Sequence, residues 1–252
     1  SASVREVCVS LLANYLLYMP AKLPVYLADV SERIMDTAVA VRKRVIRFMR
    51  DVYSLRIDYD AKLRIMLRML RCMHDMDPTV QSLALECMTV MLFSDKTRES
   101  PAVLARLFAD LCTRIRERPS PLEEFLRRLD KDKTSGGDAQ TTSASALGEL
   151  VDELISQLFA GDTEPMAMLD QLRVVHILSQ TQPNVLTISR AKQLLPYLEG
   201  AQTPAEVAVM EEILWIYSTC VCHMPRTARA FATSLEAILT LSLIHISEPT
   251  RP

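Results

Sequence analysis

The sequence predicts an all-α fold, an α-solenoid of stacked helical hairpins. Only 5 of the 252 residues are glycine, whereas about 7% is usual. Sheets and phosphate-binding loops both need glycine for turns and close backbone approach, so Rossmann, P-loop and β-sandwich folds are disfavoured. Apolar residues recur at helical spacing through most of the chain. A short pattern also repeats at an interval that suits one helical hairpin.

The first three helices are predicted from their apolar stripes and caps. Ser3 is expected to cap the first helix, and Asp36 or Thr37 to start the third. The apolar face of the first helix is expected to comprise Val4, Val7, Leu11 and Leu12. That of the second comprises Leu23, Tyr26, Leu27, Val30 and Ile34, and that of the third Val41, Val45, Phe48, Met49 and Val52.

Three of the next four helices begin at clear start signals. Asp77-Pro78 and Ser100-Pro101 each combine a capping side chain with proline at the first helical position. Ser120 and Glu123 have the spacing of a capping box. The seven helices expected in residues 1–129 cover 3–17, 23–34, 37–52, 60–72, 78–93, 101–116 and 121–129.

The second half of the chain repeats this pattern after a polar interruption. Residues 130–145 contain two glycines and no apolar stripe, which predicts a flexible linker. Helical hairpins are expected to continue over residues 146–240, with a capping box at Thr203 and Glu206. Residues 241–252 resemble the translated transposon adapter of sequencing libraries and are excluded as a non-native tail. We expect the chain to be a segment of a longer protein.

An internal repeat identifies the kind of hairpin. Val4-Arg5, Val41-Arg42 and Val80-Gln81 stand near the starts of three helices, 37 and 39 residues apart. This is the length of a HEAT-type repeat. In such repeats an aspartate at the turn and an arginine in a helix often form a ladder between units, and Asp36 and Arg42 are expected to supply one rung.

The charge is unevenly distributed. Residues 33–71 hold 11 Lys or Arg and 4 Asp, a local charge of +7, so a chain with a net charge of −2 carries −9 elsewhere. The cationic residues form one stripe on each of two successive helices, opposite their apolar faces. These stripes predict a binding site for DNA or an acidic partner; the alternative is a solvated surface neutralised by nearby aspartates. The candidate binding residues are Lys43, Arg44, Arg47, Arg50, Arg64, Arg68 and Arg71.

Enzyme signatures are scarce. Cys220, Cys222 and His223 are close in sequence, but their spacing does not match a zinc knuckle and no second ligand pair follows. No catalytic residue, metal or cofactor is expected. The six cysteines are scattered, which favours a reducing compartment. No apolar run reaches the ~20 residues of a membrane span, so no membrane partner is expected.

Residues 3–53 resemble the HEAT repeats of the cohesin-loader family, Nipped-B and its relatives. The similarity is closest at SVRE, residues 3–6, and at ERIMDTAVAVRKRVIRFMRD, residues 32–51, and it is looser over residues 179–200. The basic residues Lys43, Arg44, Arg47 and Arg50 occupy matching positions, whereas Arg42 is expected to be a structural ladder residue.

The resemblance implies a nuclear, non-enzymatic scaffold for sister chromatid cohesion. Such proteins load the cohesin ring onto chromosomes, contact its kleisin and SMC subunits, bind DNA without sequence preference and stimulate the SMC ATPase. No small-molecule substrate is implied. A generic HEAT adaptor that binds a protein segment is the alternative, because it needs only the repeat period.

Overall fold

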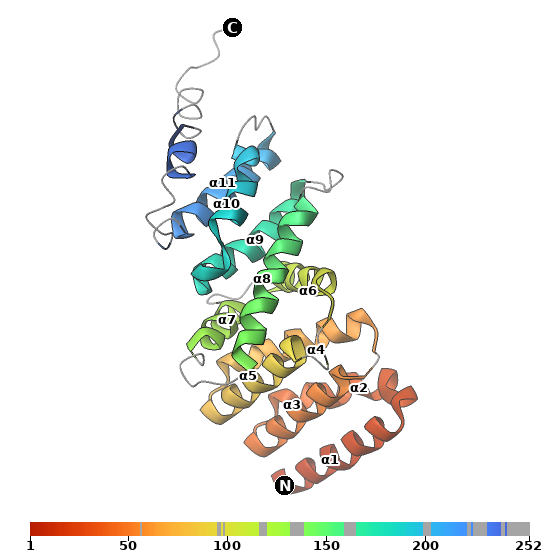
Figure 1. Ribbon diagram of the computed structural model, residues 1–252. Helices are drawn as coiled ribbons and strands as arrows, with labels where there is room; N and C mark the ends of the chain where they lie inside the picture. The colour runs from red at the N-terminus through yellow and green to blue at the C-terminus, as the bar shows by residue number, and fades with distance from the viewer. Residues whose placement is uncertain are drawn as a thin grey trace. The chain divides into compact units, whose positions relative to one another are not determined.

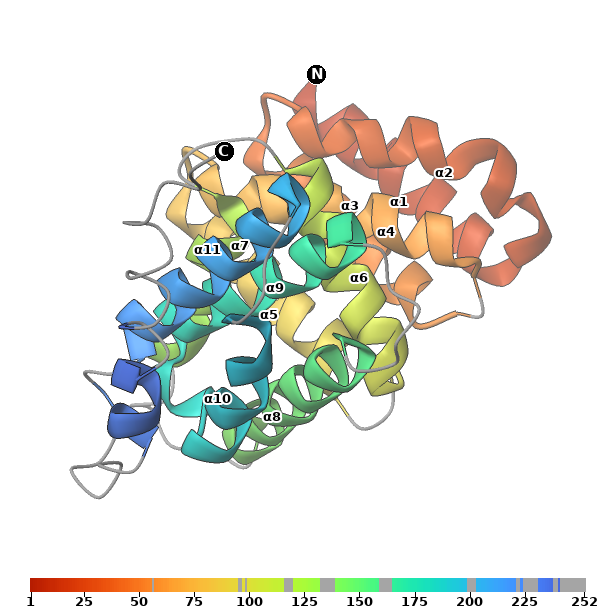
Figure 2. The ribbon, with the colours of Figure 1, turned by 90° about the horizontal axis from the view of Figure 1, so that it is seen from above.

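The computed structural model describes residues 1–55, 57–94, 97, 99–115, 120–131, 139–158, 165–198, 203–220, 223, 231–237 and 240. These residues form helices and loops with no strand among them, which confirms the predicted fold class (Figures 1 and 2). Contacts divide the chain into two compact units. Unit 1 comprises Ser1–Ser100 and Thr113–Ser143, and unit 2 comprises Pro101–Cys112 and the chain from Ala144 onward.

Unit 1 is built from two layers of helices. Figure 1 shows α1, α3 and α5 stacked in order, and α1 packs on α3 as α3 packs on α5. α2 and α4 follow α1 and α3 as the second helices of two hairpins, and α7 packs against both α4 and α5. The helices of unit 1 are α1 (Ala2–Tyr18), α2 (Leu23–Glu32), α3 (Val39–Tyr53), α4 (Tyr59–Arg71), α5 (Pro78–Phe93) and α7 (Pro121–Lys131).

Unit 2 contains most of α6 (Pro101–Arg114) and most of α8 (Ala139–Leu158). It also contains α9 (Pro165–Thr181), α10 (Ile188–Leu194), α11 (Pro204–Cys220) and a short helix over 231–237. α9 packs on α11. Two tyrosine hydroxyls form hydrogen bonds between elements of unit 2. Tyr217 donates to the carbonyl of Ala191, and Tyr197 donates to that of Leu158, each at 2.7 Å.

A ladder of arginines and aspartates joins the hairpins of unit 1. Arg5 donates to both carboxylate oxygens of Asp36 at 2.8 Å. Arg42 Nη2 donates to one carboxylate oxygen of Asp75 at 2.8 Å, and its Nε lies 2.8 Å from the other oxygen as an ion pair without hydrogen-bond geometry. Arg42 also donates to the backbone carbonyl of Asp36 at 2.8 Å. The expected rung therefore exists with a shifted pairing, because each arginine reaches the aspartate that precedes the next repeat.

At the third repeat, Gln81 stands where the first two repeats have arginine. Its Nε2 donates to the carbonyl of Asp75 at 2.6 Å, as Arg42 does to Asp36. Its Oε1 accepts a bond of 2.7 Å from Arg128 of α7, which is paired with Glu124 at 2.6 Å. The polar chain therefore continues from α5 into α7.

The capping predictions are partly confirmed. Asp77 caps α5, and Thr203 and Glu206 form the predicted capping box, with bonds of 3.3 and 2.9 Å. The first helix, however, is capped by Ser1 and not by Ser3. α3 begins at Val39, because Asp36 uses its carboxylate to accept from the Ala38 N–H in the preceding turn.

The buried faces follow the predicted stripes in α3 but not in α1. The five predicted apolar residues of α3 are at most 1% exposed. In α1 the buried residues are Val9, Ala13 and Leu16, whereas three of the four predicted ones are 57–66% exposed. α1 is apolar on more than one side, so periodicity alone does not select the face that meets α3.

The predicted linker is helical at both ends. Residues 130 and 131 end α7, and α8 begins at Ala139, seven residues before its expected start at 146; residues 132–138 lie outside the described part. Extending an existing helix costs little, because each added residue gains one backbone hydrogen bond. Ser143 is buried at 3% exposure, so a small polar side chain packs here without an apolar stripe. The 241–252 tail lies outside the described residues.

Candidate functional site

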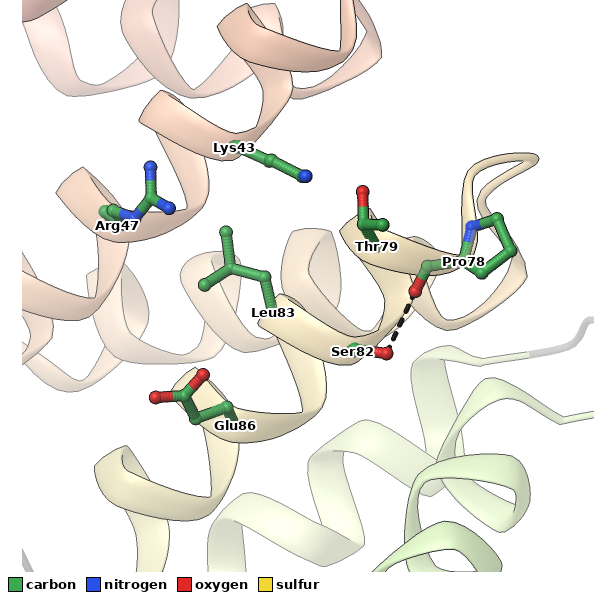
Figure 3. Close-up of a pocket in the computed structure, with 7 residues that line it drawn as sticks. All are labelled: Lys43, Arg47, Pro78, Thr79, Ser82, Leu83 and Glu86. Atoms are coloured by element: carbon green, nitrogen blue, oxygen red, sulfur yellow. Dashed lines mark hydrogen bonds between the residues drawn. The ribbon is translucent and has the colours of Figure 1, made fainter.

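Lys43 and Arg47 border a groove between α3 and α5. This α3–α5 groove has a volume of about 360 Å³. In Figure 3, Lys43 extends toward the first turn of α5, and Arg47 lies one helical turn farther along α3. The α5 wall of the groove is formed by Pro78, Thr79, Ser82, Leu83 and Glu86.

The register of α3 positions these two cations. Val41 and Val45 are fully buried on one face of α3. Lys43 and Arg47 each follow one of them by two residues, about 200° around the helix, so both side chains point away from that buried face. Lys43 and Arg47 are four residues apart, a spacing that places two Cβ atoms about 5–6 Å from one another on the same face of a helix. Arg47 is exposed and Lys43 half-buried.

Few carboxylates neutralise this groove. Among the residues that the structure describes, neither Lys43 nor Arg47 forms an ion pair. Glu86 lines the groove and reduces its positive potential. Asp77 caps the start of α5; its pKa is lowered mainly by the hydrogen bonds from Thr79, with a smaller contribution from the charge of Lys43. The arrangement leaves two cations on successive turns available to a weakly held anion.

The other two candidate binding residues of α3, Arg44 and Arg50, make contacts within unit 1. Arg44 donates to Asn14 of α1 at 3.2 Å, and its buried Nε has no partner among the described residues. Arg50 contacts the carboxylate of Asp51 at 2.7 and 2.9 Å, which raises the arginine pKa. The Arg44 contact connects α3 to α1, whereas the Arg50 contact stays within α3, and each leaves less of the guanidinium for a ligand.

The basic residues of α4 face a different groove. Arg64 and Arg68 line a cavity of about 700 Å³ between α2 and α4, here called the α2–α4 groove. Arg68 Nη1 donates to the carbonyl of Ala28 on α2 at 3.2 Å. Arg71 is exposed at the end of α4 and lines neither groove. The remaining lining residues are Pro20, Leu23, Pro24, Leu27, Ala28, Ser31, Leu55, Ile57, Asp58, Ala61 and Ile65.

The expectation of two adjoining cationic rows therefore needs correction. Lys43 and Arg47 face α5, whereas Arg64 and Arg68 face α2. Each row occupies one helix face as predicted, but α3 and α4 belong to different layers of unit 1. The sequence spacing fixes the face within a helix and does not specify the layer.

A charged cluster at the start of α4 was not anticipated. Lys62 pairs with Glu99, and its ammonium lies 5.4 Å from the ring centroid of Tyr53. Burial raises the pKa of Tyr53, with a further contribution from the charge of Glu99. Lys62 and Glu99 are 37 residues apart, so no local sequence pattern indicates this pair.

Two members of the Cys220, Cys222 and His223 cluster lie within the described residues of unit 2. Cys220 and His223 line one pocket of about 270 Å³. Cys220 is buried and its thiol donates to the carbonyl of Tyr217 at 3.7 Å, while Cys222 lies outside the described residues. No group of three or more metal-ligating side chains occurs within the described residues. None of the described helices has the length and apolarity to cross a bilayer.

Comparison with known proteins gives one consistent group of relatives. No protein-family model matches the chain. This chain is 26% identical to Nipped-B-like protein scc-2 of Caenorhabditis elegans in an alignment that covers 93% of this chain. It is 25% identical to Nipped-B protein of Drosophila melanogaster in an alignment that covers 96% of this chain. It is 22% identical to sister chromatid cohesion protein mis4 of Schizosaccharomyces pombe over 95%. The chain spans only 12%, 12% and 16% of these proteins.

Proposed function

We propose, from the premise that this chain is a distant homologue of the Nipped-B proteins, that it is a segment of a cohesin-loading scaffold. In this proposal the whole protein acts in the nucleus, contacts the kleisin and SMC subunits of cohesin, and stimulates the SMC ATPase. The segment contributes a binding surface to that assembly and no catalytic residue.

The α3–α5 groove is the proposed contact with DNA. Lys43 and Arg47 form no ion pair among the described residues and lie one turn apart beside an open groove. Cations that meet phosphates displace condensed counterions, which gives affinity without sequence preference. Because Glu86 lines the same groove, the affinity of the segment alone is expected to be low.

A salt series tests this contact directly. The slope of log K against log salt for duplex DNA is about −0.9 per phosphate contacted. Neutralising both residues in the double variant K43Q/R47Q is therefore expected to make the slope shallower by about 1.8. The matched control R64Q/R68Q removes the same charge from the other groove of unit 1 and should leave the slope unchanged.

The control also decides the outcome. If K43Q/R47Q binds DNA like the parent chain, or if R64Q/R68Q produces the larger change, the α3–α5 groove is not the DNA contact. If the chain binds no DNA at low salt, the second candidate function gains support. That candidate is a HEAT-type adaptor for a protein segment, favoured by the apolar floor of the α2–α4 groove.

A further inference from the structure

The α2–α4 groove exists because the two layers of unit 1 are packed differently. In one layer α1 packs closely on α3, and α3 packs closely on α5. In the other, α2 and α4 are not closely packed, although α7 closes the opposite side of α4. The hydrogen bond from Arg68 to the carbonyl of Ala28 spans the opening. The groove is thus a gap between successive repeats that their own side chains leave unfilled.

The floor of this groove is aliphatic. Leu23 and Ile65 are buried at its base, and Leu27, Leu55 and Ile57 are partly exposed around it. None of the lining residues is aromatic. Single-stranded nucleic acids are commonly held by stacking of bases on aromatic rings, so the lining favours an aliphatic ligand.

The rim of the α2–α4 groove carries more positive than negative charge. Arg64 is exposed and Arg68 half-buried, both on the same face of α4. The one lining carboxylate, Asp58, already accepts the N–H of Ala61 at 2.7 Å as the cap of α4. Two guanidinium groups beside an apolar floor complement a ligand that carries both aliphatic side chains and carboxylates.

We infer that the α2–α4 groove binds a short aliphatic and acidic segment of a partner protein. The lining residues of α2 extend from Leu23 to Ser31, about 12 Å along the helix axis at 1.5 Å per residue. An extended peptide covers that distance with about four residues. The bound segment places aliphatic side chains over Leu27 and Ile57 and its carboxylates against the two arginines.

A random heptapeptide library tests the inference while the partner is still unidentified. The immobilised chain is incubated with heptapeptides that are degenerate at every position, and the retained peptides are sequenced. Enrichment of aliphatic residues next to aspartate or glutamate is expected. A peptide synthesised from the enriched positions is then titrated by fluorescence polarisation.

Three variants locate the binding. A28W places an indole over the groove at an exposed position of α2, and R64Q/R68Q removes the rim charges. Both are expected to weaken peptide binding at least tenfold. R71Q, which changes the same residue type on α4 outside the groove, should alter it less than twofold. Circular dichroism confirms that each variant keeps its helical content.

Several results would overturn the inference. These are a library without enrichment, a preference for basic or aromatic residues, or selection of the same peptides by A28W. Displacement of the peptide by a single-stranded oligonucleotide would assign the groove to nucleic acid. The inference is independent of DNA binding at the α3–α5 groove, since K43Q/R47Q should retain peptide binding and R64Q/R68Q should retain the salt slope.

Discussion

The Arg42–Asp75 pair offers the sharpest test of how unit 1 is stabilised. The side chains of Arg42 and Asp75 are only 12% and 11% exposed. Replacing Arg42 by alanine removes the ion pair with Asp75, including its one hydrogen bond, and the bond to the carbonyl of Asp36. It also leaves the carboxylate of Asp75 nearly buried, and among the described residues its remaining partner is the N–H of Asp77 at 2.8 Å.

The expected cost follows from the exposure of the pair. Breaking a fully buried pair costs about 3–5 kcal/mol, whereas exposed pairs contribute about 0–1 kcal/mol. A pair that is about nine-tenths covered should lie near the lower end of the buried range, so R42A is expected to lower the free energy of unfolding by about 3 kcal/mol. At about 2–4 °C per kcal/mol, the melting temperature should fall by about 6–12 °C.

Two spectroscopic signals separate the units in this experiment. Trp215, the single tryptophan, lies on α11 in unit 2, so its fluorescence reports that unit. Far-ultraviolet circular dichroism reports helices throughout the chain. The R42A transition should therefore shift more by circular dichroism than by fluorescence.

A double-mutant cycle checks the physical cause. The variant R42A/D75N removes the unpaired charge and should recover part of the loss, with a coupling energy of at least about 1 kcal/mol. A fall in melting temperature of less than about 2 °C for R42A would refute the reasoning. Strict additivity of R42A and D75N would refute it as well, because the two side chains would then act independently.

Three further predictions concern other parts of the molecule. The pKa of Asp36 is lowered from 3.8 to about 2, mainly by the hydrogen bond from Arg5. A carboxyl group with a depressed pKa stabilises the fold when the pH is above its pKa in the unfolded chain, and this contribution is lost as the pH falls through its pKa in the folded chain. The difference in stability between the parent chain and D36N should therefore narrow as the pH falls from about 4 to 2 in thermal melts. A gap that widens in that interval would contradict the assignment. Tyr217→Phe removes the buried bond to Ala191 and should cost about 1 kcal/mol in a denaturant titration, while an unchanged midpoint would show that bond to be dispensable. Val7 and Leu11 are 57% and 66% exposed, so V7K/L11K should cause little loss of helical signal in circular dichroism, and a collapse of that signal would place the two side chains in the core.

Helices and their starts were largely predictable because their determinants are local. A capping side chain such as Asp77 acts on residues within one turn. The apolar residues of α3 that recur at helical spacing are the residues that the structure buries. The buried face of α1 was predicted wrongly because apolar residues occupy several sides of this helix. Helix α8 began earlier than expected because small residues extend a helix without forming a stripe.

The site was only half predictable for a different reason. The spacing of Lys43 and Arg47, or of Arg64 and Arg68, fixes a face of one helix. Whether that face meets α5 or α2 depends on how hairpins stack, and the volume of a groove depends on distances between helices far apart in sequence. The Arg42–Asp75 contact joins residues 33 positions apart, and only the repeat period suggested that such a contact exists.

The polar chain from Arg5 through Gln81 to Arg128 also restricts how the hairpins can slide. An apolar interface tolerates small displacements, because one methyl group replaces another at nearly equal energy. A guanidinium held at 2.8 Å by two oxygens has no equivalent neighbour one helical turn away. Translation of one hairpin by a turn would break several charged contacts together, so these contacts hold the stacking offset of the hairpins at one value.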